Sequence, residues 1–257
     1  MVRGLYAAYT GMLNEQKRLD VVSNNIANAA TVGFKKDGVT NQSFDDVLAV
    51  KIKDGSEAYV DRKIGTMNLG VKLGENYTDY TQSSLRETGN TYDMAIEGNG
   101  FFKVAVKNSE GKETTKYTRA GNFTMNKDGY IVDSSGNHLL GENGYVQVPT
   151  SAASVSIDSE GNVYADGTLT DKIQLADFED YDYLKKYGDT MYDTLDGATE
   201  KDATGSLRQG YTEQSNVQSV NEMVNMIAIT RSYEANQKVI QTVDSMLDKT
   251  VNSVAKV

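Results

Sequence analysis

Few residues in this sequence could carry out chemistry. The chain has one histidine, His138, and no cysteine, so disulfides and thiolate metal ligands are excluded. A metal site or a nucleophilic triad would have to combine His138 with carboxylates alone. Because His138 stands beside a turn in the stretch SGNHLLG, we interpret it as a surface histidine and not as a catalytic residue.

The densest group of carboxylates lies in the stretch DFEDYDYLKKYGD, where the acids alternate with tyrosines. Its members are Asp177, Glu179, Asp180 and Asp182. Two carboxylates can hydrolyse a glycosidic bond when one of them is held protonated as the general acid. Neighbouring acids on a polar loop do not usually gain the raised pKa that this role needs. We therefore expect a solvated acidic face here.

Two further stretches have only a superficial likeness to binding loops. The run DSSGNHLLGE, which begins at Asp133, lacks the glycine and the bidentate glutamate of a calcium loop at the required offsets. The run GNGFF at 98–102 lacks the lysine and the following helix of a phosphate-binding loop. Both are interpreted as turns. The sequence thus predicts no enzyme: no catalytic residue, no metal site and no cofactor.

Length, composition and charge limit the function further. The 257 residues can bury a sizeable core, and length alone suggests one or two domains. The formal charge of −10 disfavours nucleic acid as a partner, because phosphate binding needs a clustered basic surface. No apolar run approaches the roughly 18 residues of a spanning helix, so no membrane insertion is expected. Thr10, Asn14 and Glu15 interrupt the apolar core of any cleavable signal peptide.

The charge is unevenly distributed along the chain. Residues 1–35 carry a net charge of +2 and residues 215–257 a net charge of zero, which leaves −12 for residues 36–214. Nearly neutral ends are typical of segments that pack against many copies of a partner molecule, and an acidic middle is typical of a region that faces water.

The first segment has the spacing of an amphipathic helix. Apolar or small residues recur at alternating intervals of three and four, interrupted only by Glu15: Leu5, Ala8, Met12, Leu19, Val22, Ile26 and Ala29. This is a heptad seam. Neither glycine nor proline occurs between Gly11 and Gly33, so the sequence predicts a helix of about 18 to 25 residues that ends near Ala30.

The last segment is also predicted to be a long helix. No glycine or proline occurs in the 47 residues from Tyr211 to Val257. Ser215 with Gln218, or Ser219 with Glu222, offers a capping box at its start. The seam of this helix reads Met226, Ile229, Tyr233, Asn236, Ile240, Val243, Leu247, Thr250 and Val254. The two helices are expected to pair with each other or with neighbouring molecules.

The centre of the chain has the pattern of antiparallel strands. Short apolar runs between Asn99 and Leu175 are separated by acidic and serine–glycine turns. The stretches NKDGYIVDSSGN and DSEGNVYADG suggest a repeated hairpin. The predicted fold is α+β: terminal helices paired as a coiled coil from residues 1–35 and 212–257, a central mostly antiparallel β domain at 76–195, and extended connectors at 36–75 and 196–211.

Both ends of the chain carry motifs of a known family. The stretch LYAAYTGMLNEQKRLDVVSNNIANAATVGFKK resembles the N-terminal signature of the bacterial flagellar rod and hook family, and QGYTEQSNVQSVNEMVNMIAITRSYEANQKVIQTVDSMLDKT resembles its C-terminal signature. DMAIEGNGFFKV and YTRAGNFTMNKDGYIVDSSG resemble the β domain of the larger rod proteins. The resemblance covers almost the whole chain, although Val32 stands where many relatives have a proline.

The resemblance implies residues for an assembly interface. Positions that match the two motifs are Asn24, Asn25, Asn28, Gly33, Phe34, Lys35, Ser215, Asn216, Val217, Met223, Met226, Ile227, Arg231, Tyr233, Glu234, Asn236 and Met246. From these motifs and the two seams, the expected interface comprises Leu5, Met12, Leu19, Val22, Asn24, Asn25, Ile26, Asn28, Gly33, Phe34, Asn216, Met226, Ile229, Tyr233, Asn236, Ile240, Val243, Leu247 and Val254. Small residues there would let neighbouring helices approach closely, while amides would satisfy backbone groups.

The resemblance also implies the function. A member of this family is a structural subunit of the flagellar basal-body rod, which assembles helically into the tubular drive shaft that transmits torque to the hook and contains the export channel. The implied partners are further copies of the chain, the adjacent rod and hook proteins and the flagellar type III export apparatus. The implied location is the basal body, outside the cytoplasmic membrane, reached without cleavage of a signal peptide.

Two alternatives stay open at this point. The chain is too short for a hook subunit and too long for the small proximal rod proteins, so it is either a distal rod protein or the proximal rod protein that carries a β domain. In a different functional class, a flagellum-associated cell-wall hydrolase with helical flanks is the alternative to a structural subunit.

Overall fold

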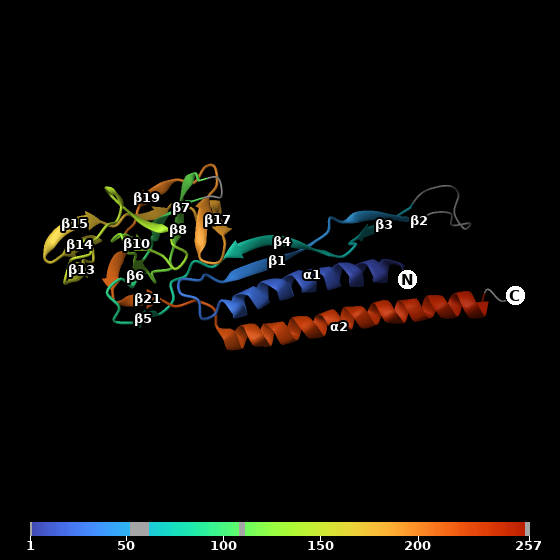
Figure 1. Ribbon diagram of the computed structural model, residues 1–257. Helices are drawn as coiled ribbons and strands as arrows, with labels where there is room; N and C mark the ends of the chain where they lie inside the picture. Colours follow the sequence, from blue (N-terminus) through green and yellow to red (C-terminus); the bar gives the residue numbers. More distant parts are fainter. Residues whose placement is uncertain (1, 52–61, 108–110, 255–257) are drawn as a thin grey trace. The chain divides into compact units, whose positions relative to one another are not determined.

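The chain forms two compact units, which the computed structural model describes over residues 2–51, 62–107 and 111–254 (Figure 1). The first unit comprises residues 1–26, 37–78 and 219–257, and the second comprises residues 27–36 and 79–218. The fold class is α+β, with an N-terminal helix, a C-terminal helix and a central antiparallel β domain. The sequence predicted each of these three parts.

The first unit contains two long helices and four strands. They are α1 (Val2–Ala27), β1 (Asp37–Ser43), β2 (Val47–Lys51), β3 (Arg62–Met67), β4 (Val71–Thr78), α2 (Ser219–Lys249) and the π-helical turn η2 (Thr250–Val254). α1 ends at Ala27 and not near Ala30, because Asn28 accepts hydrogen bonds from the amide and the hydroxyl of Thr31. None of the described helices is both long and apolar enough to cross a membrane.

The two helices and the β1–β4 ribbon lie along one another within the first unit (Figure 1). The helices run in opposite directions, so the start of α1 lies beside the end of α2. At their contact, a methyl group on Gly11 would lie 3.0 Å from Nδ2 of Asn236. On another side of α1, the Asn14 amide donates to Oδ1 of Asn41 in β1 at 3.1 Å. α1 is therefore packed between α2 and the ribbon.

The two segments that the sequence assigned to extended connectors are paired strands. In residues 36–75, β1 pairs antiparallel with β4, and β2 pairs antiparallel with β3. The glycines that suggested a linker serve this ribbon: Gly70 has a φ of +135°, and a methyl group there would lie 2.2 Å from Oγ1 of Thr10. In residues 196–211, β19 (Glu200–Asp202) and β20 (Ser206–Gln209) pair with strands of the second unit.

The second unit is an assembly of short antiparallel strands. Besides β19 and β20 it contains β5 (Leu85–Glu87), β6 (Met94–Glu97), β7 (Phe101–Lys107), β8 (Glu113–Thr118), β9 (Thr124–Met125), β10 (Ile131–Val132), β11 (His138–Gly141), β12 (Gly144–Tyr145), β13 (Val155–Ile157), β14 (Asn162–Ala165), β15 (Thr168–Lys172), β16 (Leu175–Phe178), the 3₁₀ turn η1 (Tyr181–Tyr183), β17 (Leu184–Tyr187), β18 (Met191–Thr194) and β21 (Tyr211–Glu213). Its main sheet has the order β17-β18-β8-β7-β11-β10-β9, with β12 beside β11 and β16 between β7 and β19. β13–β14–β15, β6–β20 and β5–β21 form smaller sheets.

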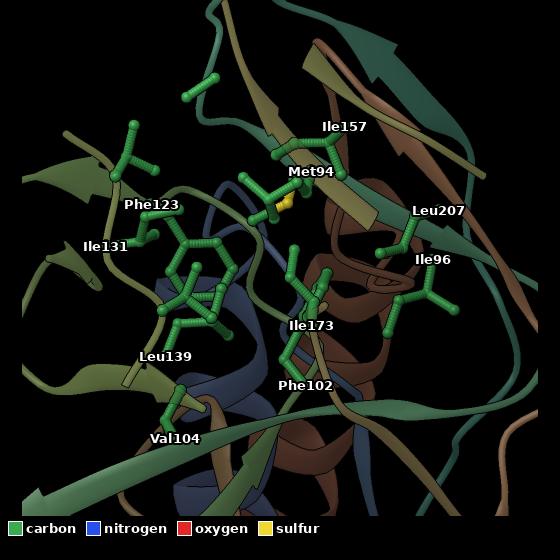
Figure 2. Packing of buried hydrophobic residues seen from close by; sticks show 14 of the residues in the cluster. Met94, Ile96, Phe102, Val104, Phe123, Ile131, Leu139, Ile157, Ile173 and Leu207 are labelled. Carbon is green, nitrogen blue, oxygen red and sulfur yellow. The ribbon is translucent and has the colours of Figure 1, made fainter. Parts of the chain in front are cut away.

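Apolar side chains from many of these strands form the core of the second unit. Figure 2 shows Phe102 of β7, Ile131 of β10 and Leu139 of β11 gathered with residues from β6, β13 and β20. Phe102 packs edge to face on Phe123, with the ring centroids 5.2 Å apart. Because strands distant in sequence contribute to one core, this unit depends on long-range contacts.

The predicted hairpin repeat corresponds to three loops with the same backbone hydrogen bonds. They cover residues 126–130, 133–137 and 158–162. In each loop the first residue donates its amide to the carbonyl of the fifth and accepts from the amide of the fourth, a glycine. These glycines, Gly129, Gly136 and Gly161, have φ values of +85°, +84° and +89°, a region that L side chains rarely adopt. Turn chemistry therefore explains these stretches.

Candidate functional site

The seam predicted on α2 is the less exposed side of that helix. Ile229 is buried, and Met226, Tyr233, Asn236, Ile240 and Val243 are half-buried, whereas their sequence neighbours are exposed. Leu247 departs from the pattern because it is 40% exposed. The backbone of Val254 lies in η2, and its side chain lies outside the described part of the structure. The contact of Asn236 with Gly11 places this face against α1.

α1 has two covered faces, of which the sequence predicted one. Its seam residues are buried or half-buried at Leu5, Ala8, Met12, Leu19, Val22 and Ile26. The second covered face carries amides that contact the ribbon. Asn25 is 1% exposed; its side chain donates to the carbonyl of Asp37 at 2.8 Å and accepts from the amide of Asp37 at 3.0 Å. Asn24, at the preceding position, is exposed.

Each helix also presents apolar side chains to solvent. We call Tyr6, Tyr9 and Leu13 of α1, which are 58%, 48% and 43% exposed, the Tyr6 patch. We call Val220, Met223, Val224 and Ile227 of α2, which are 71%, 50%, 61% and 55% exposed, the Val224 patch. In both patches the spacing of three, four and seven residues places the side chains on one side of the helix.

Lys35 of the N-terminal motif lies in a buried ion-pair cluster inside the second unit. Nζ of Lys35 lies 2.7 Å from Oε1 of Glu213, and Nη1 of Arg119 lies 3.5 Å from Oε2 of the same carboxylate. Lys35, Glu213 and Arg119 are 1%, 0% and 3% exposed. We call these three residues the Lys35 cluster. Burial lowers the pKa of Lys35 although the charge of Glu213 acts to raise it.

Backbone groups complete the Lys35 cluster. Lys35 also donates to the carbonyl of Thr81 at 2.8 Å, and Glu213 accepts from the amide of Ser83 at 3.0 Å. The amide of Gly33 donates to the backbone carbonyl of Glu213 at 2.9 Å. Breaking a buried pair of this kind costs several kcal/mol, because an uncompensated charge is left in the interior. The cluster therefore holds together segments that are far apart in the sequence.

The residues beside the cluster are fixed by contacts of their own. Asn216 accepts from the amide of Lys36 at 2.7 Å and donates to the carbonyl of Asp79 at 2.8 Å. The ring of Phe34 is 0% exposed, with Nζ of Lys186 4.0 Å from its centroid. Gly33 has a φ of +69°, and a methyl group there would lie 2.4 Å from the amide nitrogen of Ala120.

Three residues of the predicted interface are covered within the subunit itself. Gly33, Phe34 and Asn25 are buried within the subunit and are not exposed on the helical surface. Sequence reasoning placed Lys35 on a motif without a role, and it did not select Glu213 or Arg119. Nothing in the local pattern signals these two charges as buried, because their partner is distant in sequence.

The acidic stretch is also not the uniformly solvated face that we predicted. Asp177 is 1% exposed and lies 3.1 Å from Nζ of Lys201. It accepts from the hydroxyl of Tyr181 at 2.8 Å and from the amide of Phe178 at 2.9 Å. Burial acts to raise the pKa of Asp177, but these contacts together hold it below its ordinary value. Glu179, Asp180 and Asp182 are exposed.

The remaining candidates for chemistry, His138 and Asp133, make contacts that stabilise the local fold. His138 is half-buried and stacks on Tyr145, with the ring centroids 4.7 Å apart. The carboxylate of Asp133 accepts from the amides of Ser135 and Asn137 and so closes its own loop. Among the described residues, no group of three or more histidine and acidic side chains is arranged to hold a metal ion.

Comparison with known families matches the two helical ends and part of the β domain. Residues 5–35 match the family described as flagella basal body rod protein, and residues 208–253 match the flagellar basal body rod FlgEFG protein C-terminal family. Residues 95–165 match the flagellar hook protein FlgE/F/G D1 domain. The two terminal matches contain α2, α1 from Leu5 onward, and two of the three members of the Lys35 cluster, Lys35 and Glu213.

Similar proteins align with the chain from end to end. The flagellar basal-body rod protein FlgG of Bacillus subtilis is 38% identical over 98% of this chain and 99% of its own length. FlgG of Caulobacter vibrioides is 36% identical over 97% of this chain and 98% of its own. The flagellar hook-basal body complex protein FlhO of Bacillus subtilis is 32% identical over the whole of both chains. The chain therefore belongs to the flagellar basal-body rod protein family.

Proposed function

We propose that this chain is a structural subunit of the bacterial flagellar basal-body rod, which assembles helically with further copies of itself into the tubular drive shaft around the export channel. The observation that carries this proposal is the end-to-end similarity to rod proteins, at 38% identity over 98% of the chain. The helical unit of this subunit, with apolar patches on its outer sides, supports it.

The helices α1 and α2 form the axial part of the subunit in this proposal, paired as a coiled coil and comprising residues 1–35 and 212–257. Their contact at Gly11 and Asn236 and the covered seam of α2 support this arrangement. The β domain forms the outer layer. Its surface suits that position, because the second unit has 23 acidic and 14 basic residues.

The assembly interface is formed by exposed and half-buried helix residues of neighbouring copies. In this proposal the seam residues stabilise each helix pair, and Asn24 and Asn28 lie at the end of α1 where subunits approach. The buried residues Gly33, Phe34 and Asn25 and the half-buried Asn216 act inside each subunit, where their hydrogen bonds and packing hold neighbouring segments together.

The remaining partners are the adjacent rod and hook proteins and the flagellar type III export apparatus. The chain reaches the basal body outside the cytoplasmic membrane without loss of its N-terminal segment. This part of the proposal is supported by α1 itself, because its residues pack against α2 and the ribbon and a cleaved chain would lose those contacts.

The test is purification of hook–basal bodies from the source bacterium, followed by mass spectrometry of the chain. We expect the chain in the purified particles, with an intact N-terminus. Its absence from the particles would contradict the proposal. A peptidoglycan zymogram separates the hydrolase alternative: we expect no clearing by the purified chain, and a cleared band would favour the hydrolase.

A further inference from the structure

The Val224 patch has the composition of an interface core. Its four side chains occupy the side of α2 that is nearly opposite to the seam, because one residue corresponds to about 100° of helix rotation. Glu222 is the one acidic or basic residue between Ser219 and Thr230, and it is 1% exposed. Centres of protein interfaces are depleted in charged residues and enriched in methionine and aromatic residues.

The Tyr6 patch has the same character. Residues 4–14 contain no acidic or basic residue. Two of the three patch residues are tyrosines, which combine a large apolar surface with few rotatable bonds. The first charged positions beyond the patch are Glu15 and Lys17. An apolar helix face bounded by charges indicates a binding surface.

The two patches lie at different levels of the helix pair. Gly11 is opposite Asn236, and Val224 precedes Asn236 by twelve residues. At about 1.5 Å per residue, Val224 is displaced by about 18 Å along the helix axis from the level of Gly11, which lies between Tyr9 and Leu13 of the Tyr6 patch. The two patches of one subunit therefore cannot cover each other, and contact between them needs two molecules.

Charge favours a second copy as the occupant. The first unit contains 12 basic and 13 acidic residues, so it is nearly neutral. The second unit, with a net charge of −9, repels another copy of itself. Copies can therefore approach closely through their helical units, whose nearly neutral net charge gives little repulsion.

We infer that the Tyr6 patch of one copy packs against the Val224 patch of the next copy, displaced along the helix axis. This inference rests on the proposed function. Because the two surfaces differ, the contact is heterologous: each copy leaves one patch of each kind free for the next neighbour. Such a contact propagates into an open helical array and does not close on a dimer.

The absence of cysteine from the chain allows a clean test by disulfide crosslinking of engineered cysteines. The full chain carrying both Leu13→Cys and Val224→Cys is assembled, oxidised with copper phenanthroline and run on a non-reducing gel. We expect a ladder of covalent multimers that a reducing agent dissolves. Each single variant should stay monomeric, because two identical patches do not meet. A matched control pairs Leu13→Cys with Asn225→Cys, an exposed position in the same helical turn but on another side, and should give no ladder.

Three outcomes would overturn the inference: crosslinked dimers from either single variant, an equal ladder from the control pair, or no ladder from assemblies that sediment normally. The last result would leave the proposed function intact, whereas a wild-type chain that forms no assembly and is absent from basal bodies would contradict both the inference and the proposed function.

If the double cysteine variant does not sediment, Leu13→Lys and Val224→Glu replace it. Each single substitution should abolish sedimentation. Sedimentation should return when the two single variants are mixed or when both substitutions are combined in one chain, and its failure to return would contradict the pairing of the two patches.

Discussion

Lys35 and Glu213 are separated by 178 positions in the sequence, yet their charged groups lie 2.7 Å apart in the interior of the second unit. Such a pair contributes little net stability relative to apolar residues of the same size, but the loss of one partner is costly. We therefore expect the pair to act in specificity, by favouring burial of the segment 33–36 next to Glu213 over other arrangements.

Removal of the lysine charge tests this role. Lys35→Met should destabilise the chain by about 3 kcal/mol, because Glu213 would keep only one ion pair, the longer contact to Arg119, beside its hydrogen bond from the amide of Ser83. Urea denaturation followed by circular dichroism measures the change. Lys107→Met is the matched control, since its pair with Glu113 is exposed and should contribute at most about 1 kcal/mol. Equal effects of the two substitutions would show that the Lys35 cluster is not a stability determinant.

The lowered pKa of Asp177 predicts that the folded chain loses stability in acid. Because its pKa in the folded chain is below the ordinary value of 3.8, its contribution is present above that value and is lost as the pH falls through the folded pKa. Asp177→Asn should therefore show a flatter decline of unfolding free energy below about pH 4 than the wild type. Asp180→Asn, at an exposed position, is the control and should follow the wild-type curve. Parallel curves for all three proteins would contradict the assignment.

At the scale of the elements, Asn25 connects α1 to β1 through two hydrogen bonds with the backbone of Asp37. Asn25→Ala leaves the partly buried amide and carbonyl of Asp37 without this partner, which costs about 1–3 kcal/mol. Hydrogen exchange of the Asp37 amide should accelerate accordingly. Ser23→Ala, at an exposed position of the same helix, should not change that exchange rate. Unchanged protection in Asn25→Ala would mean that the ribbon is held by other contacts.

The sequence was informative where structure is local. The helices have a periodic seam without proline, so both were predicted, and the three glycine loops were recognised by their turn residues. The β1–β4 ribbon was missed because Asp37–Ser43 and Val71–Thr78 are polar, partly exposed and distant from each other in sequence. A strand whose outer face meets water and whose inner face meets helix amides has no apolar alternation to detect.

The less exposed side of α2 could be predicted from the sequence, and the Lys35 cluster could not. Spacing identified the seam residues from Met226 to Val243, because a helix converts sequence interval directly into a face. It could not identify the Lys35 cluster, since a lysine and a glutamate look alike in sequence whether they are buried or solvated. It also could not separate the residues that act within a subunit, such as Phe34, from those available to a neighbour.

At the scale of the whole molecule, the two units differ in net charge and in the apolar side chains that they expose. The nearly neutral helical unit exposes apolar side chains, and the β unit carries almost all of the net charge of −10. Association through the helices and solvation of the β unit are compatible with one helical array of identical subunits. A defect in the helical unit is then repeated at every subunit, whereas a surface change in the β unit is not.

The most direct measurement of this account is the amount of the chain in purified hook–basal bodies of a strain that carries Ile240→Asp. A carboxylate at this half-buried seam position should cost several kcal/mol in each subunit. The account predicts that the variant is made and exported but absent from basal bodies and that the cells do not swim, while Asp180→Ala cells retain both the protein and motility. Wild-type levels of Ile240→Asp protein in rods of motile cells would contradict the assembly of this subunit through its terminal helices.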